Sequence, residues 1–170
     1  MLRFTKFIKQ FLPNPKRELI VIEINTFIKI GHDQFMNFSA YHYDIKDVNN
    51  IEGSIHLNIN RVILLKYNMC DYIDKLWANL VQGLEQIKNN NEFKTHFESQ
   101  PIEIKLKPIG NDVLVSVNSN MKVEALINKK YFIKAMSEHA LYFFNKLSGF
   151  NKIQENRYQS EIEQLERICL

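Results

Sequence analysis

The sequence is poor in cysteine, glycine and proline, with two, five and four residues of these types among 170. Cys70 and Cys169 have no partner at the spacing of a metal or redox motif, which excludes a disulfide framework and a cysteine-based zinc site. A reducing compartment is therefore expected. Glycine-rich phosphate loops, nucleophile elbows and His-Glu zinc motifs are also missing. The sequence thus offers no catalytic residues, no metal ligands and no cofactor site.

Long apolar runs and a strong net charge are lacking as well. No run approaches the ~20 residues that a membrane-spanning helix needs. The start, MLRFTKFIKQFLPNP, lacks the apolar core and cleavage site of a signal peptide. We therefore expect a cytoplasmic protein without a membrane span. The net charge of +3 is too small to indicate a nucleic-acid or membrane partner by itself.

Aromatic residues, by contrast, are abundant. Twelve phenylalanines and seven tyrosines favour a strand-rich interior packed with aromatic rings. The length fits a single domain over residues 1–170. Residues 1–15 are predicted to form a basic amphipathic helix that ends at its prolines. We expect this helix to pack on the α+β body at residues 18–148, and binding to a membrane surface is the alternative.

Residues 18–30 carry the strongest strand pattern in the sequence. Isoleucines fall on one face, and residues that are only partly apolar fall on the other. A turn at residues 31–33 leads into residues 34–45, which are predicted to return as a second strand. The inward residues of that strand would be Met36, Phe38 and Ala40.

Residues 54–60 alternate in the same way and predict a further strand. Residues 61–67 follow without a turn signal, so they either continue that strand after a bend or form a fourth one. Together with the strands before them, these segments predict an antiparallel meander, one face of which is covered by a helix.

Residues 71–90 form the clearest predicted helix. Asp71 is the expected N-cap, and the asparagines at 89–91 suit the left-handed end of a helix. Gly83 in the interior indicates close approach of a strand. Apolar residues recur on one face of a 3.6-residue repeat, and the single tryptophan among them is interpreted as a core anchor: Ile73, Leu76, Trp77, Leu80, Val81, Leu84 and Ile87.

A second strand block follows this helix. Residues 101–109, 113–119 and 121–127 are predicted to be consecutive antiparallel strands. Residues 129–148 are predicted to be one long helix, and a strand over 129–136 is the alternative. The inner face of this helix would consist of Phe132, Met136, Ala140, Phe143, Phe144 and Leu147.

Residues 151–170 are polar with a thin apolar stripe, formed by Tyr158, Ile162, Leu165 and Cys169. This pattern predicts a C-terminal helix that docks loosely or meets a partner. The fold class is therefore α+β. It has two antiparallel strand blocks, each followed by an α-helix, with short N-terminal and C-terminal helices.

The densest polar and aromatic cluster of the sequence is Tyr41-His42-Tyr43-Asp44. His42 and Asp44 would share a strand face and could form an acid–base pair. The same face carries Met36, however, and a buried or rim histidine is the commoner outcome there.

Glu23 and Asn25 lie in mid-strand, on the face opposite the isoleucines. Such positions are usually solvated. If Tyr41 and Tyr43 neighbour them, the result would be a polar-aromatic surface of the kind that binds a protein partner. We therefore name one candidate binding set, made of Glu23, Asn25, Tyr41, His42, Tyr43 and Asp44.

The combination of strand blocks with two particular helices resembles immunity proteins of bacterial toxin systems. These proteins neutralise polymorphic or contact-dependent growth inhibition toxins. The helices that carry the resemblance contain LWANLVQGLEQI and NKKYFIKAMSEHALYFFNKLSGF. The order of elements over residues 18–148 also looks like the Whirly single-stranded DNA-binding fold.

The resemblance implies function by stoichiometric binding. The protein would cover the active site of a cognate toxin C-terminal domain and would not be an enzyme itself. A Whirly-type module that binds single-stranded nucleic acid is the alternative, and an enzyme with a site hidden from sequence is the third. The basic residues that favour nucleic acid are few and lack interleaved aromatics: Lys105, Lys107, Lys122, Lys129 and Lys130.

Overall fold

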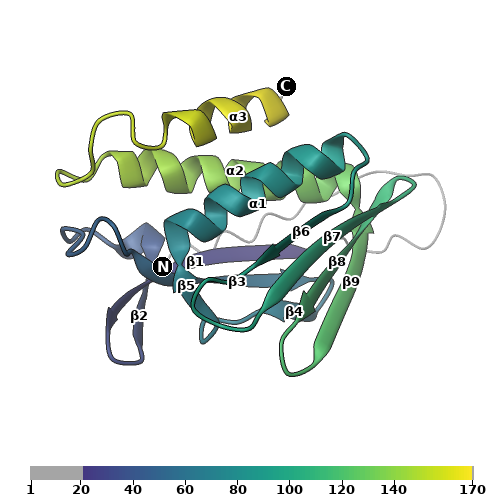
Figure 1. Cartoon of the computed structure of the whole chain (residues 1–170), viewed down its shortest axis with the longest axis horizontal. Coiled ribbons are helices and arrows are strands. Elements are labelled where there is room, and N and C mark those ends of the chain that lie inside the picture. Colours follow the sequence, from purple (N-terminus) through teal and green to yellow (C-terminus); the bar gives the residue numbers. More distant parts are fainter. Residues whose placement is uncertain (1–20, 170) are drawn as a thin grey trace.

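Two antiparallel sheets form the body of the protein in the computed structural model, which describes residues 21–169. The first sheet has the strand order β2-β1-β3-β4, and β5 also pairs with β3 (Figure 1). Its strands are β1 (Ile22–Gly31), β2 (Gln34–Asn37), β3 (Glu52–Ile59), β4 (Val62–Leu65) and β5 (Cys70–Tyr72).

The second sheet is a meander with the order β6-β7-β8-β9. Its strands are β6 (Phe93–His96), β7 (Glu103–Ile109), β8 (Asp112–Asn118) and β9 (Lys122–Asn128). Helix α1 (Ile73–Lys88) follows the first sheet, α2 (Lys129–Ser148) follows the second, and α3 (Gln159–Cys169) comes last. This order confirms the predicted α+β class, in which each of two strand blocks is followed by a helix. The N-terminal helix predicted over 1–15 lies outside the described residues.

Residues 34–45 are not the continuous strand that their alternation predicts. The strand β2 ends at Asn37, whose side-chain oxygen accepts a hydrogen bond from the Ser39 N–H at 2.9 Å. This bond starts a short 3₁₀ helix, η1 (Phe38–Ala40). Local side-chain bonds of this kind compete with sheet pairing. Phe38 is buried as predicted, but Ala40 is exposed.

The first sheet is also not the predicted meander, because β1 lies between β2 and β3. Residues 41–51 connect η1 to β3 without a helix or strand. A two-residue turn at Asn60 and Arg61, with φ of 50° and 71°, then reverses the chain. Residues 61–67 therefore contain a separate fourth strand. The strands β5 and β6 were not predicted, because three or four residues are too few to show alternation.

Helix α1 begins at Ile73, and Asp71 is not its N-cap. The Asp71 carboxylate instead accepts hydrogen bonds from the backbone N–H groups of Glu98 at 3.0 Å and Ser99 at 3.1 Å. It thereby joins β5 to the loop between β6 and β7. The close approach predicted at Gly83 is confirmed, since a Cβ there would lie 2.5 Å from the Phe93 ring.

Helix α2 spans 129–148 without interruption, so the alternative of a strand over 129–136 is wrong. The Asn128 side chain caps its start and accepts a hydrogen bond from the Tyr131 N–H at 3.4 Å. The predicted inner face is confirmed, because all six of its residues are buried.

The C-terminal helix α3 is shorter than the predicted stretch and begins at Gln159. The predicted apolar stripe is confirmed except at its last position: Tyr158 and Leu165 are buried and Ile162 packs against the core, whereas Cys169 is exposed and Ile168 is buried instead. Both ends of this segment are tied to α1. The Tyr158 hydroxyl donates to Asp74 at 2.8 Å, and the Lys88 ammonium donates to the carbonyl oxygen of Ile168 at 2.9 Å.

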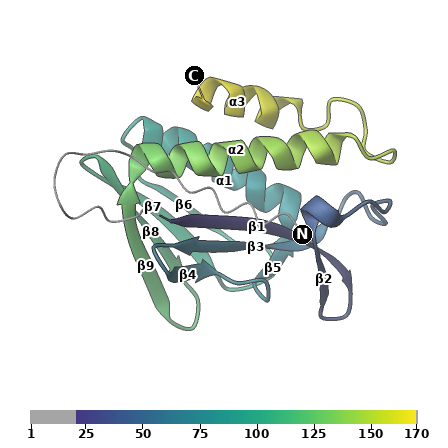
Figure 2. The ribbon, with the colours of Figure 1, turned by 180° about the vertical axis from the view of Figure 1, so that it is seen from behind.

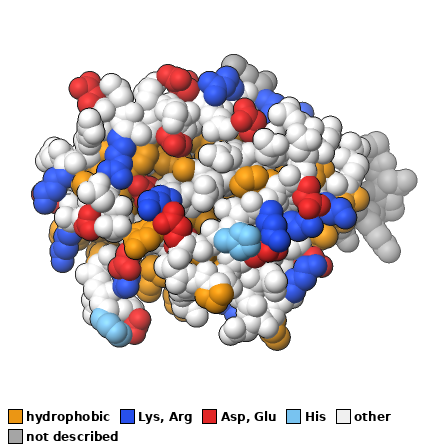
Figure 3. Space-filling view, in the orientation of Figure 1, with side chains coloured by type: hydrophobic (Ala, Val, Ile, Leu, Met, Phe, Trp, Pro, Cys, Tyr) orange, Lys and Arg blue, Asp and Glu red, His pale blue; other side chains and the backbone are white. Residues whose placement is uncertain are grey.

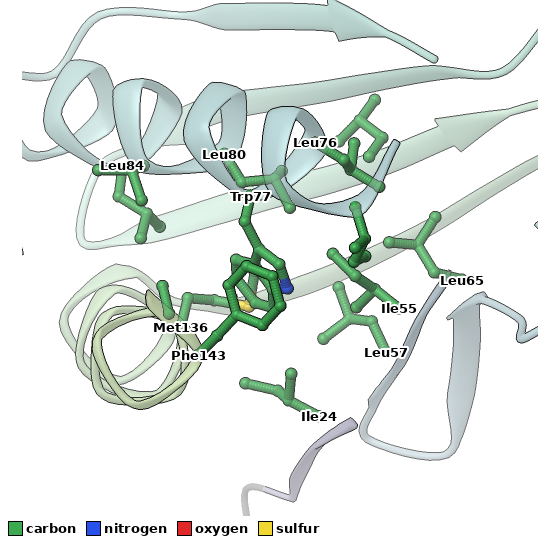
Figure 4. Packing of buried hydrophobic residues seen from close by; sticks show 14 of the residues in the cluster. Ile24, Ile55, Leu57, Leu65, Leu76, Trp77, Leu80, Leu84, Met136 and Phe143 are labelled. Carbon is green, nitrogen blue, oxygen red and sulfur yellow. The ribbon is translucent and has the colours of Figure 1, made fainter. Parts of the chain in front are cut away.

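The three helices lie together on one side of the two sheets (Figures 1 and 2). One buried apolar cluster includes residues of both sheets and of all three helices. Trp77 is fully buried in it and packs against Phe143 of α2, which confirms its role as a core anchor (Figure 4). Within residues 21–169, no helix is long and apolar enough to span a bilayer.

Candidate functional site

A pocket of about 750 Å³ opens between the β1–β2 hairpin and the irregular segment at residues 41–51, and the first residue of β3 also lines it. The hairpin ends with β2 at Asn37, and the next strand, β3, begins only at Glu52. The residues that line the pocket are Ile28, Lys29, Ile30, Gly31, His32, Met36, Tyr41, Tyr43, Asp44, Ile45, Lys46, Asp47, Asn50, Ile51 and Glu52.

The buried part of the pocket is apolar. Ile28 comes from the inward face of β1, while Ile45 and Ile51 come from the irregular segment, and each is at most 5% exposed. The Tyr41 ring packs between Phe150 and Tyr43, with a centroid distance of 5.8 Å to each. Burial raises the pKa of the Tyr41 hydroxyl. These contacts make a fixed floor from residues of three separate parts of the chain.

The mouth of the pocket carries exposed apolar side chains. Tyr43 is 65% exposed although its ring meets the Tyr41 ring edge-on, and Ile30 is 39% exposed. The Tyr41 hydroxyl donates to the backbone carbonyl oxygen of Asp44 at 3.1 Å, which holds the 41–44 turn in place. An exposed aromatic ring on a well-packed support is a common anchor for protein partners.

Charged groups surround this mouth. The Lys29 ammonium lies 3.1 Å from the Glu52 carboxylate, and this hydrogen bond raises the pKa of Lys29. The Asp47 carboxylate accepts hydrogen bonds from the Asn50 side chain at 3.0 Å and from the Asn49 N–H at 2.9 Å, which lower its pKa. The rim is thus polar and organised around an apolar floor, as in many protein interfaces.

Comparison with known protein families, curated proteins and solved structures finds no match to this chain. The function is therefore argued from the pocket itself.

Three residues of the predicted binding set line the pocket, namely Tyr41, Tyr43 and Asp44. His42 is exposed and is not among the lining residues. The acid–base pair considered for His42 and Asp44 required both residues on one strand face, and that premise is wrong because residues 42–44 belong to no strand.

Glu23 and Asn25 lie elsewhere, on the face of the first sheet that points away from its buried isoleucines. Glu23 is opposite Asn58 and Asn25 is opposite His56 in the β1–β3 pairing. The Asn37 side chain donates to the Asn25 side-chain oxygen at 3.3 Å. The structure therefore does not bring the predicted set together, since Glu23 and Asn25 are in β1 and do not line the pocket.

Sequence reasoning missed several lining residues, above all Ile45, Asp47 and Ile51. They lie in a segment without periodicity, so no face could be assigned to them. The run DVNN at 47–50 was visible as a loop. Its turn-forming carboxylate was a signal that the segment is ordered, since Asp side chains often close such turns.

A second polar cluster lies in the core between the sheet and the helices. The Trp77 indole N–H donates to the Thr26 hydroxyl at 3.1 Å, and that hydroxyl lies 2.9 Å from His139 Nε2. Burial lowers the pKa of His139 to about 4. This network joins β1, α1 and α2. Among residues 21–169, no three His, Cys, Asp or Glu side chains lie close enough together to hold a metal ion.

Proposed function

We propose that the protein is an immunity protein that binds a cognate bacterial toxin domain and neutralises it by covering its active site. The observation that carries this proposal is the pocket at residues 41–52, with Tyr43 exposed at its mouth. The resemblance of the two helix sequences to immunity proteins gives the partner class. The binding would be stoichiometric and would involve no chemical step.

The anatomy of the pocket supports a protein partner. Interfaces concentrate their binding energy in a few aromatic or Arg residues that pack over a dry centre inside a polar rim. Tyr43 offers a large rigid surface, because only two side-chain torsions are lost when it is immobilised. Tyr43 contacts Tyr41, which itself packs on Phe150, so little rearrangement is needed before a partner docks.

The test is co-expression of the full chain with toxin domains encoded next to its gene. The expected result is a one-to-one complex that survives purification, together with rescue of growth in cells that express the toxin domain. Absence of a complex at micromolar concentration would contradict the proposal. A complex without growth rescue would also contradict it, because the toxin would then be bound but still active.

A Whirly-type module that binds single-stranded nucleic acid is the second candidate, favoured by the order of strands and helices. Against it, lysines on the outer face of the second sheet are paired with glutamates. Lys94 lies 2.7 Å from Glu103, and Lys122 lies 2.6 Å from Glu124. In Figure 3, Lys and Arg side chains are accordingly mixed with Asp and Glu side chains. Pairing of this kind weakens the attraction for phosphate.

Gel retardation with single-stranded oligonucleotides at low salt separates the two candidates. Nucleic-acid binding by this fold would show a shift that disappears steeply as salt is added, since neutralised phosphates release counterions. The immunity proposal predicts no shift at protein concentrations that saturate the toxin complex.

A further inference from the structure

The pocket also indicates what kind of group it receives, an inference that rests on the proposed function. We infer that it receives an arginine side chain of the toxin domain, with the aliphatic stem on the isoleucine floor and the guanidinium between Tyr43 and Asp44. Three features support this assignment: the shape of the cavity, the sign of its charge and the arrangement of its rings.

The pocket has room for a long side chain. A volume of about 750 Å³ lies within the range of roughly 300–1,000 Å³ that is typical of ligand sites. The floor at Ile28, Ile45 and Ile51 is apolar and buried, whereas the carboxylates lie at the rim. Arginine has the matching form, because it packs an apolar stem on such surfaces while its charged head remains among polar groups.

The lining is acidic, although the whole protein has a net charge of +3. Three carboxylates line the pocket, from Asp44, Asp47 and Glu52, against the two lysines Lys29 and Lys46. Lys29 is neutralised by Glu52 at 3.1 Å, and Asp47 is held by Asn49 and Asn50. The partners of Asp47 are neutral amides and leave its charge in place, so Asp44 and Asp47 stand against the single positive charge of Lys46 and the lining favours a cation.

The rings distinguish arginine from other cations. A guanidinium is planar, stacks on aromatic faces and binds a carboxylate through two parallel hydrogen bonds. Tyr43 presents an exposed ring, and Asp44 follows it directly in a turn that the Tyr41 hydroxyl holds. Both residues line the same pocket, which offers a guanidinium a ring for stacking and a carboxylate for pairing.

The site can be tested without the toxin. The probe is Nα-acetyl-arginine methylamide, titrated into the full-length isotope-labelled protein while the Tyr43 ring and the Ile45 and Ile51 methyl groups are followed by NMR. Saturable shifts with a dissociation constant on the order of millimolar are expected for a single side chain. The matched control is the citrulline analogue, which replaces the guanidinium by an uncharged urea of the same shape.

Three variants sharpen this test. Asp44→Asn should weaken the probe at least about tenfold, as expected when a charge-assisted pair is lost. Lys46→Gln should strengthen it severalfold, because it removes the opposing charge. Glu166→Gln, an exposed carboxylate on α3, is the control and should leave the affinity unchanged. A preserved NMR spectrum verifies that each variant is folded.

Equal binding of the arginine and citrulline analogues would overturn the inference, as would an Asp44→Asn variant that binds the arginine probe normally. These results are distinguishable from failure of the immunity proposal. If the toxin complex forms but the probe does not bind, only the arginine assignment fails. If the probe binds as described but no toxin domain is captured, the pocket still selects a guanidinium, whereas the proposed function fails together with the toxin domain as the source of the arginine.

Discussion

The indole ring of Trp77 stacks on the imidazole ring of His139, with a centroid distance of 5.3 Å. Thr26 connects the two rings from below through its hydroxyl. Because the indole N–H can only donate, the Thr26 oxygen accepts from Trp77, and the same hydroxyl shares a second hydrogen bond with His139 Nε2. Burial lowers the pKa of His139 to about 4, so its ring is neutral in the folded protein at pH 7.

This geometry predicts that acid destabilises the fold. The pKa of His139 is about 4 in the folded state and about 6.5 when the chain is unfolded. The unfolded state therefore binds more protons between these values, so the stability that is complete above pH 6.5 is lost as the pH falls toward 4. Urea unfolding at pH 7 and pH 5 should show a loss of about 1–2 kcal/mol from this residue.

The matched variants for this measurement are His139→Gln and His32→Gln. His32 has a 97% exposed side chain, so its replacement should leave the difference between pH 7 and pH 5 unchanged. His139→Gln should reduce that difference. An equal pH dependence in both variants would contradict the lowered pKa of His139.

Replacement of Thr26 by valine should destabilise the protein by about 1–3 kcal/mol, since the shape is kept but two buried polar atoms lose their partner. Thr26 is only 2% exposed. Thr95→Val in β6 is the control, because Thr95 is similarly buried but takes no part in the network. Denaturant unfolding measures the free energy of unfolding of both variants. If Thr26→Val loses no more stability than Thr95→Val, the network does not contribute.

Gly83→Ala should be destabilising although alanine favours helices by about 1 kcal/mol. The new Cβ would lie 2.5 Å from the Phe93 ring and 3.1 Å from Leu106. Such overpacking costs about 1–3 kcal/mol. The double variant Gly83→Ala with Phe93→Leu should recover part of the loss in thermal unfolding. A single variant with an increased melting temperature would show that β6 is not packed this closely.

Asp71→Asn should destabilise the protein by about 1–3 kcal/mol, because a buried carboxylate loses charge-assisted hydrogen bonds from the Glu98 and Ser99 backbone. Hydrogen exchange should become faster in residues 97–100 before it does in α1. The exposed residue Asp33 provides the control, Asp33→Asn. Equal exchange in both variants would show that Asp71 does not hold this loop.

Regular elements were predictable because their residues repeat with the period of the structure. The helix α2 was predicted with its correct bounds, since its apolar residues recur at helical spacing from Phe132 to Leu147. The strand predicted over 34–45 failed because the Asn37 side chain bonds the backbone two residues on. A local bond of this kind leaves no trace in the alternation of apolar residues.

The candidate site was only partly predictable for the same reason. Tyr41, Tyr43 and Asp44 were conspicuous by composition, whereas Ile45 and Ile51 depend on the path of a segment without periodicity. Glu23 and Asn25 were grouped with the tyrosines because a second strand was expected to continue beyond Asn37. Since the chain leaves the sheet at that point, Tyr41 and Tyr43 do not pair beside Glu23 and Asn25.

The most direct test of the account is the affinity of the toxin domain for two tyrosine variants, measured by calorimetry. Tyr43 and Tyr67 are 65% and 60% exposed, but only Tyr43 lines the pocket. Tyr43→Ala should weaken the complex by about 2 kcal/mol, roughly thirtyfold, and Tyr67→Ala should leave it unchanged. Equal affinity of Tyr43→Ala and the unmodified protein would contradict the account.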